Sequence, residues 1–149
     1  SCFVEAKVVG HYTNSILATT EAKAKGYDEA LLTDMNGYVA EGPGANFFIE
    51  KDGKLFTAPL GNILAGITRQ TVLEIGKELG YEIEEKYFTP DEIFTADSAF
   101  FCGTAAEVIG IESVNEYKFP LEWEDSIGAV IQKKYKRRVA HNEYQNVYL

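Results

Sequence analysis

Hydrophobic and polar positions along the first part of the chain repeat with two different periods. Residues Phe3 to Val9 alternate loosely and are rich in β-formers, which predicts a short strand. From Thr13 to Lys25 apolar residues recur at helical spacing, and Gly26 follows where a helix commonly ends. Two tight turns, at Asn36-Gly37 and at Asp52-Gly53, each separate a pair of β-rich segments. Because such dipeptides adopt positive φ at low cost, the pattern predicts two β-hairpins.

The middle of the chain predicts a longer helix, a strand and a short helix. Apolar spacing indicates a helix in which Thr68 is the N-cap or a first-turn residue and Gly80 marks the end. Tyr81 to Tyr87 is typical of a strand. The sequence "TPDE", Thr89 to Glu92, matches a capping box with proline at the first helical position, so a short helix is expected to begin there.

The last third of the chain predicts two strands and a final helix. The apolar run "SAFFCGTAAEVIGIESV" indicates a buried strand, a break at Gly103 and a further strand. A helix is expected from about Ser126 to Tyr144. Its inner face is expected to consist of Ile127, Val130, Ile131 and Tyr135. Strands joined mainly by hairpins, with interleaved helices, predict the α+β class with mostly antiparallel sheets, and no linker divides residues 1–149 into more than one domain.

Composition and charge narrow the class of protein. The chain of 149 residues is 46% hydrophobic and 25% charged, which is typical of a soluble globular protein. Neither a membrane-spanning apolar run nor a signal peptide is evident, so a cytoplasmic location is expected. The formal net charge of −9 argues against nucleic acid as the main partner. The basic run Lys133 to Arg138 is interpreted as a solvated face that complements the helix dipole near a C-terminus.

Cysteine and histidine are too sparse for a disulfide framework or a metal site. Cys2 and Cys102 are the only cysteines and are expected to be reduced, while His11 and His141 stand alone in the sequence. No Gly-x-Ser-x-Gly elbow, Walker loop or dinucleotide fingerprint occurs. No metal is therefore predicted.

Two segments carry residues suited to covalent and acid–base chemistry. Lys7 lies near the end of a predicted strand, where burial can lower the pKa of an amine enough for Schiff-base formation, and Tyr12 follows closely. Glu41 ends another predicted strand and precedes a Gly-Pro-Gly turn that lets the backbone approach a ligand. The ordinary alternatives are a solvated lysine and a turn without function.

Two further segments are suited to binding an anion. "GITR", Gly66 to Arg69, lies at a predicted helix start, where free amides and the helix dipole favour negative charge. "CGTAAE", Cys102 to Glu107, follows an apolar strand with small residues that leave amides uncovered. A routine helix cap and a bend at a sheet edge are the alternatives. Together, a lysine, a carboxylate and two anion sites are the parts needed to hold pyridoxal phosphate.

Four stretches of the sequence resemble one enzyme family: "AKVVGHYTNSILA", "DEALLTDMNGYVAEGPGANFFI", "ILAGITRQTV" and "DSAFFCGTAAEV". In this order they are similar to the C-terminal half of branched-chain amino acid aminotransferases, which are fold-type IV pyridoxal phosphate enzymes. The similarity runs through nearly the whole chain, and "EGPGxNxF" combined with "GTAAE" is quite specific. D-amino acid aminotransferases and aminodeoxychorismate lyases share the fold but usually differ at those two motifs.

The resemblance implies a role for each candidate residue. Lys7 matches the lysine that binds the cofactor covalently and moves a proton between the substrate α-carbon and the cofactor. Tyr12 matches the tyrosine that hydrogen-bonds the cofactor phenolic oxygen, and Glu41 matches the acid that pairs with the pyridine nitrogen. A carboxylate there keeps the ring protonated, so the ring can accept electrons from the broken Cα–H bond.

Phosphate contacts are implied in the same way. Ile67 and Thr68 match the backbone and hydroxyl contacts at a helix N-terminus, and Thr104 matches a second phosphate donor. The amides of Thr104 and Ala105 correspond to a site near the phosphate and the substrate carboxylate. Arg69 also follows the family pattern, and a supporting structural role is expected for it.

The chain departs from the family pattern at three single residues and in its length. His11, Ala45 and Ala65 stand where the family commonly has asparagine, glutamate and proline. Family members also carry an N-terminal domain before the lysine, which supplies much of the substrate pocket. The chain is therefore expected to be the C-terminal cofactor-binding domain of a longer protein, and to be inactive alone.

The function implied by the resemblance is transfer of the amino group of leucine, isoleucine or valine to 2-oxoglutarate. The expected partners are these amino acids, 2-oxo acids and further copies of the protein in a homodimer or higher homo-oligomer. An aminodeoxychorismate lyase or a D-amino acid aminotransferase of the same fold is an alternative. A non-catalytic domain used for association is another.

Overall fold

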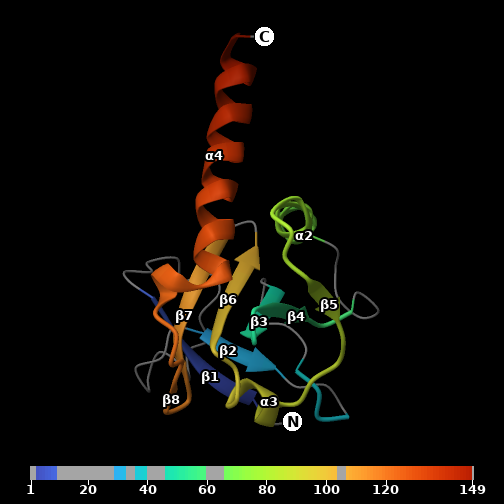
Figure 1. The fold of residues 1–149 in the computed structure, drawn as a ribbon, viewed down its shortest axis with the longest axis vertical. Coiled ribbons are helices and arrows are strands. Elements are labelled where there is room, and N and C mark those ends of the chain that lie inside the picture. Colours follow the sequence, from blue (N-terminus) through green and yellow to red (C-terminus); the bar gives the residue numbers. More distant parts are fainter. Residues whose placement is uncertain are drawn as a thin grey trace.

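The computed structural model describes residues 3–9, 29–32, 36–39, 46–59, 66–103 and 107–148. Its strands are β1 Phe3–Val8, β2 Glu29–Leu32, β3 Asn46–Lys51, β4 Lys54–Thr57, β5 Ile83–Glu85, β6 Ser98–Gly103, β7 Glu107–Val114 and β8 Tyr117–Lys118. Its helices are α2 Ile67–Glu78, α3 Pro90–Ile93, the 3-10 turn η2 Trp123–Asp125 and α4 Ile127–Tyr148. The strands form one sheet in the order β2-β1-β7-β6-β3-β4-β5, with β8 added on β7 (Figure 1).

The predicted α+β class with mostly antiparallel pairing is confirmed. Every strand pair in the described residues is antiparallel except one, because β4 and β5 run parallel. The connection between those two strands contains α2, as a parallel pair requires a crossover. A single β4-α2-β5 unit is therefore set into an otherwise antiparallel sheet.

Local sequence signals account well for the β3–β4 hairpin and for the limits of α2. Asp52 and Gly53 both adopt positive φ, 53° and 77°, as a two-residue turn between these strands demands. Gly66 is the N-cap of α2, which places Thr68 in the first turn rather than at the cap. Gly80 ends the helix with φ of 83°, a conformation that glycine adopts without strain.

The short helix α3 begins as the capping box predicted. Pro90 occupies the start of the helix, and the Thr89 amide donates to the Glu92 carboxylate over 3.2 Å. The strand predicted over Tyr81 to Tyr87 is shorter than expected, since only Ile83–Glu85 pairs as β5. Glu84 and Glu85 of this edge strand are exposed.

The two faces of the sheet carry separate hydrophobic clusters. Adjacent phenylalanines point to opposite faces, so Phe47 and Phe101 belong to one cluster and Phe48 and Phe100 to the other. The rings of Phe48 and Phe100 stack with centroids 4.8 Å apart, an arrangement worth about 0.5–1.5 kcal/mol beyond area burial. The second cluster is covered by α2 and α4, which contribute Val72, Ile75, Ile127 and Ile131.

The final helix differs from its prediction in two respects. Val130 was expected on the inner face but is 37% exposed, because Ile127 and Ile131 face the sheet and residue 130 is turned away from it. The helix also continues to Tyr148, so the basic run Lys133 to Arg138 lies in its middle and not in its last turn. Figure 1 shows the later part of α4 projecting beyond the sheet.

The start of α4 is fixed to the sheet by a buried carboxylate. Glu50 of β3, 6% exposed, accepts a hydrogen bond of 2.7 Å from the Ile127 amide. Ser126 adds a second cap, since its hydroxyl accepts from the Ala129 amide over 3.1 Å. Trp123 of η2 lies against two glycines nearby, Gly110 of β7 and Gly128 of α4, whose missing side chains leave room for the indole.

Two sequence predictions concern the segment between β1 and β3. β2 pairs with β1, and Gly37 has the positive φ, 82°, that the Asn36-Gly37 turn predicts. Of the second strand predicted after that turn, Val39 donates its amide to the Phe88 carbonyl over 2.7 Å instead of extending a hairpin ladder. The helix predicted from Thr13 to Lys25 lies outside the described residues.

Candidate functional site

Lys7 lies on the inner strand β1, one residue from its end. Ala6 and Val8 on either side are buried in the first cluster, so alternation along the strand directs Lys7 to the opposite face. Its side chain is exposed among the described residues. The ladder to β7 also shifts register between Lys7 and Val8, which is a bulge of the kind that redirects a side chain.

The N-terminus of α2 presents backbone donors and a buried hydroxyl. The first amides of a helix have no partner within the helix, and the N-cap residue of α2, Gly66, has no side chain to accept from them. Thr68 is 6% exposed, whereas the side chain of Ile67 is 84% exposed, so Ile67 offers its amide and little packing. This turn combines donors with the positive end of the helix dipole, which favours an anion.

Strand pairing brings the candidate segments together at the place where several inner strands begin or end. We call this end of the sheet the candidate edge. The start of β3 pairs with the end of β6 through Asn46 and Cys102, and Gly66 lies beside Asn46, since a Cβ on Gly66 would be 3.7 Å from its Oδ1. β6 ends where β7 begins, at the pair Gly103 and Glu107. The end of β1 lies alongside this part of β7, because the Val9 amide donates to the Gly110 carbonyl over 2.8 Å.

Three of the seven predicted site residues can be placed, and they fit this edge. Lys7, Ile67 and Thr68 are described, and the strand ends that adjoin the other segments meet at the same edge. The remaining predicted residues, Tyr12, Glu41, Thr104 and Ala105, lie outside the described residues.

Glu107 is a residue that sequence reasoning gave no role and that the fold sets apart. It has φ of 56°, a left-handed conformation that non-glycine residues rarely adopt. Such backbone strain costs on the order of 1–3 kcal/mol and persists where the surrounding structure demands it. Here it marks the sharp reversal between β6 and β7 that joins the paired residues Gly103 and Glu107.

Arg69 is the most buried charged group near the edge. Its side chain is 3% exposed, and one terminal nitrogen donates to the Ala58 carbonyl over 3.0 Å and to the Glu85 carboxylate over 2.7 Å. The Nε atom has no hydrogen-bond partner within the described residues. The expected structural role of Arg69 therefore has a concrete form, which is a bridge from α2 to the ends of β4 and β5.

The donors described at this edge fit a phosphate-bearing cofactor. The amides of Ile67 and Thr68 at the helix start, the buried Thr68 hydroxyl and a buried guanidinium whose Nε has no partner within the described residues all prefer an anion nearby. Lys7 adds an amine on the same side of the sheet as α2, where an aldehyde group can be bound covalently. No group of three or more His, Cys, Asp or Glu in the described part of the chain is arranged to hold a metal.

Cys102, at the end of β6, is not a reactive thiol. It is fully buried, and burial raises the pKa of its thiol to about 12, although the Arg69 charge acts in the opposite direction. The protonated thiol is the stable form across the physiological range. Among the described residues Cys102 is free, as expected of a reduced cysteine.

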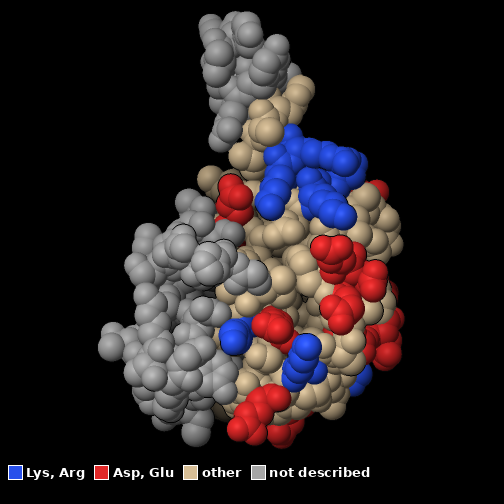
Figure 2. Space-filling view, turned by 90° about the vertical axis from the view of Figure 1, so that its left-hand side faces the viewer, with Lys and Arg blue, Asp and Glu red and all other residues tan. Residues whose placement is uncertain are grey.

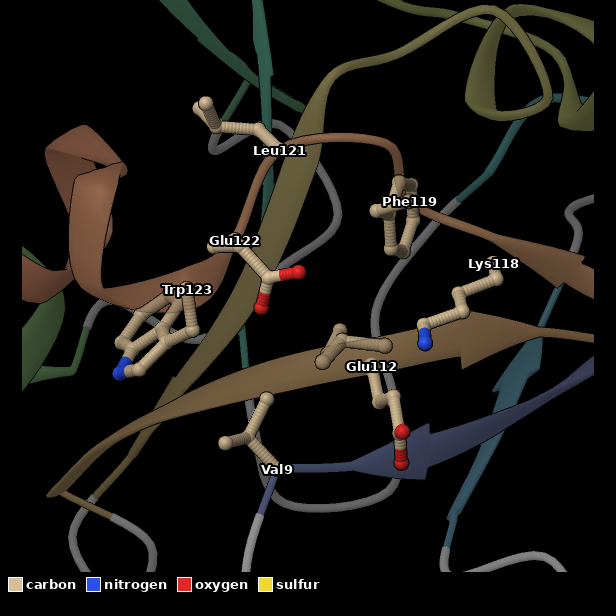
Figure 3. A pocket seen from close by; sticks show the side chains of 8 residues that line it. Val9, Glu112, Lys118, Phe119, Leu121, Glu122 and Trp123 are labelled. Carbon is tan, nitrogen blue, oxygen red and sulfur yellow. The ribbon is translucent and has the colours of Figure 1, made fainter.

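A hollow of about 180 Å³ lies over β7, between Val9 at the end of β1 and the segment from Lys118 to Trp123 (Figure 3). Glu122 enters it from the segment before Trp123, and Lys118 from β8 on the other side. Its lining contains none of the predicted site residues. A second, more open hollow of about 470 Å³ runs along α2 and β5 and is lined by Leu73, Lys77, Tyr81, Ile83 and Glu85.

Basic and acidic side chains gather on different parts of the surface. Figure 2 shows a cluster of Lys and Arg on α4 where it leaves the body, and Asp and Glu on the body below. The exposed members of the basic run are Lys133, Lys134, Lys136 and Arg137. Arg138 turns inward and pairs with Glu74 and Glu78 of α2, at 3.5 and 2.8 Å. No helix in the described ranges is long and apolar enough to cross a membrane.

Comparison with known proteins decides the family. The model of the class IV amino-transferases matches residues 2–114, which include β1, the first turn of α2 and the β6–β7 edge. The chain belongs to the class IV aminotransferases. Its candidate edge is thus the part of this class IV aminotransferase where β1, β3, β6, β7 and α2 meet.

Two relatives of the chain have closely similar descriptions. A branched-chain-amino-acid aminotransferase of Pseudomonas aeruginosa is 46% identical over 87% of this chain and 42% of its own length. A probable branched-chain-amino-acid aminotransferase of Aquifex aeolicus is 50% identical over 75% of this chain and 37% of its own. The chain spans about two fifths of these curated relatives.

A solved structure confirms the fold. The branched-chain amino acid aminotransferase of Thermobaculum terrenum, in its PLP form, superposes with a TM-score of 0.80 and 37% identity. The match covers 89% of this chain and 44% of the other. The mixed sheet with few helices is therefore the architecture of these enzymes.

Proposed function

We propose that the chain binds pyridoxal phosphate with Lys7 and the first turn of α2, and forms the cofactor-binding part of a branched-chain amino acid aminotransferase. The observation that supports it best is the meeting of β1, the β6–β7 reversal and the uncapped N-terminus of α2 at one sheet edge. The relatives' common description and the PLP form of one solved relative agree with it.

Lys7 has two tasks in this proposal. Its Nζ binds the cofactor aldehyde covalently, and after substrate exchange it carries a proton at the same atom. Alternation with the buried Ala6 places the amine on the face that carries α2. Pyridoxal phosphate, when bound, supplies an electron sink for the bond that breaks at the substrate α-carbon.

The other residues orient the cofactor and neutralise its charge. The amides of Ile67 and Thr68 and the Thr68 hydroxyl hold the phosphate, with Thr104 as a second donor. Glu41 keeps the pyridine nitrogen protonated, and Tyr12 donates to the phenolic oxygen. Thr104 and Ala105 offer amides to the substrate carboxylate.

The cofactor half of the proposal is tested by trapping. The chain is incubated with pyridoxal phosphate, reduced with borohydride and digested, and the peptide masses locate the adduct. We expect the adduct on Lys7, its loss in Lys7→Ala, and its retention in Lys51→Ala, which removes another strand lysine. An adduct spread evenly over the lysines, or one that persists in Lys7→Ala, contradicts the site.

The reaction half is tested with substrates, in the longest expressed form of the protein that contains this chain. We expect leucine, isoleucine and valine to convert bound cofactor to its amino form and 2-oxoglutarate to restore it. Lys7→Ala is expected to lower turnover by about a thousandfold or more. Conversion by D-alanine or aminodeoxychorismate, with none by leucine, replaces the proposal by another activity of the same fold.

Assembly and location form the last part of the proposal. We expect a homodimer or higher homo-oligomer in the cytoplasm, with amino acids and 2-oxo acids as its small-molecule partners. Light scattering of the longest expressed form measures the assembly. A monomer that retains full activity contradicts this part alone.

A further inference from the structure

Arg69 connects the first turn of α2 to two strands that are distant in sequence. It is the third residue of the helix, directly after Ile67 and Thr68. Its guanidinium donates to the carbonyl of Ala58, which follows β4, and to the carboxylate of Glu85, which ends β5. The contact therefore ties the turn to the adjoining ends of the two parallel strands, where Thr57 pairs with Glu85.

This contact is rigid because both ends of it are constrained. The Arg69 side chain is 3% exposed, and a planar guanidinium that is held by two acceptors cannot rotate freely. Both strand ends are fixed by the sheet, since the Lys86 amide also donates to the Thr57 carbonyl over 2.9 Å. The contacts of Arg69 thereby fix the direction in which the amides of Ile67 and Thr68 point.

The charge of Arg69 also reaches the second anion segment. The guanidinium is permanently charged, and Glu85, its carboxylate partner among the described residues, is 47% exposed and so partly screened by water. Arg69 lowers the pKa of Cys102 against the effect of burial, which places its positive potential at the end of β6. Gly103 and the "TAA" segment follow directly in the sequence. One buried charge thus acts on both segments predicted to hold phosphate.

We propose that Arg69 is a positioning residue that makes this site selective for a phosphorylated cofactor. It holds the first turn of α2 through Ala58 and Glu85, and its buried charge favours a phosphate dianion at the amides of Ile67 and Thr68. The inference rests on the proposed function for the identity of the ligand. It assigns the discrimination between pyridoxal phosphate and pyridoxal to Arg69, which supports the amides that bind the phosphate.

The test compares the dissociation constants of pyridoxal phosphate and pyridoxal, measured by absorbance titration. We expect Arg69→Met to weaken pyridoxal phosphate about tenfold or more, or at least 1.4 kcal/mol, and to change pyridoxal by less than about threefold. Arg138→Met is the matched control, because Arg138 also bridges to α2 but at Glu74 and Glu78, in its later turns. It is expected to leave the ratio of the two constants unchanged.

Arg69→Lys separates charge from geometry. Lysine keeps the positive charge but lacks the planar fork, so we expect an intermediate preference for pyridoxal phosphate. Equal weakening of both ligands in Arg69→Met, or no change in either, overturns the proposal. A full preference retained in Arg69→Met has the same consequence.

A measurement without cofactor distinguishes failure of this inference from failure of the proposed function. Hydrogen exchange at the Gln70 amide, which donates to the Gly66 carbonyl over 3.1 Å in the first turn, is expected to rise in Arg69→Met and Arg69→Lys, while Arg138→Met raises exchange only towards Glu78. Unchanged exchange in the first turn overturns the positioning role, whether or not the wild type binds pyridoxal phosphate. If the exchange result holds but the wild type forms no Lys7 adduct, the proposed function fails and the phosphate selectivity with it.

Discussion

At the scale of single residues, burial decides which groups take part in chemistry. Lys7 is exposed at the sheet edge, whereas Cys102, only a strand end away, is fully enclosed. The enclosed thiol stays protonated because burial raises its pKa to about 12. Of these two groups, only the amine is accessible to a ligand.

The thiol of Cys102 is expected to react only when the chain unfolds. With a pKa of about 12, roughly one molecule in ten thousand carries the thiolate at pH 8. In a Cys2→Ser variant, where Cys102 is the single cysteine, modification by a disulfide reagent should follow the unfolding rate measured by fluorescence. Rapid modification of the folded chain contradicts the burial described.

The predictability of the site also follows residue by residue. The position of Lys7 on a strand and of Thr68 in a first helical turn came from local patterns, and both are confirmed. The partners of Arg69 lie 11 and 16 residues away, so no local pattern reveals them. Glu107 gave no signal either, because its left-handed backbone arises from the pairing of β6 with β7. The roles of Tyr12, Glu41, Thr104 and Ala105 stay predictions.

At the scale of elements, short-range signals were reliable and long-range pairing was not. The β3–β4 turn, the capping box of α3 and the end of α2 at Gly80 are all fixed within a few residues. The parallel pairing of β4 with β5 is set by the packing of α2 against the sheet, which periodicity does not report. The prediction that Val130 lies on the inner face was wrong for the same reason, because the rotation of α4 about its axis follows from its contacts with Glu50 and Trp123.

The contact between η2 and α4 depends on a missing side chain. A Cβ on Gly128 would lie 2.6 Å from the Trp123 ring and 2.7 Å from Phe100. We expect Gly128→Ala to lower the free energy of unfolding by about 1–3 kcal/mol, measured by urea denaturation, because the ring must shift out of a packed position. Val130→Ala, on the exposed side of α4, is the control and should cost less.

A second substitution that removes the overlap with the Trp123 ring checks whether that overlap causes the loss of stability. Combining Gly128→Ala with Trp123→Leu should cost less than the sum of the two single changes, because the smaller side chain leaves room for the new methyl group. Simple additivity in this double-mutant cycle would show that the alanine acts in another way.

At the scale of the whole molecule, the Glu50 carboxylate links the sheet to α4 and makes the stability of the fold depend on pH. Burial raises the pKa of Glu50 above its usual 4.5, Asp97 adds to the rise, and the hydrogen bond from the Ile127 amide opposes it. The folded chain thus holds a proton here that the unfolded chain releases. The contribution of Glu50 to stability is complete below pH 4.5 and is lost as pH rises through the folded pKa.

Glu50→Gln removes this titration while keeping an oxygen for the Ile127 amide. We expect the stability of the variant relative to wild type to improve as the pH rises above 4.5, measured by urea denaturation at each pH. A stability difference for Glu50→Gln that is independent of pH contradicts the assignment.

The short strand at one end of the sheet has a consequence for behaviour at high concentration. An unpaired strand edge is a template for pairing with other chains, and long apolar edges lead to aggregation. β5 exposes only three residues along this edge, and two of them, Glu84 and Glu85, carry charge into solvent. A strand this short, with charged side chains, is a poor template for pairing with another chain, and its carboxylates already pair within the fold, Glu84 with Lys54 and Glu85 with Arg69.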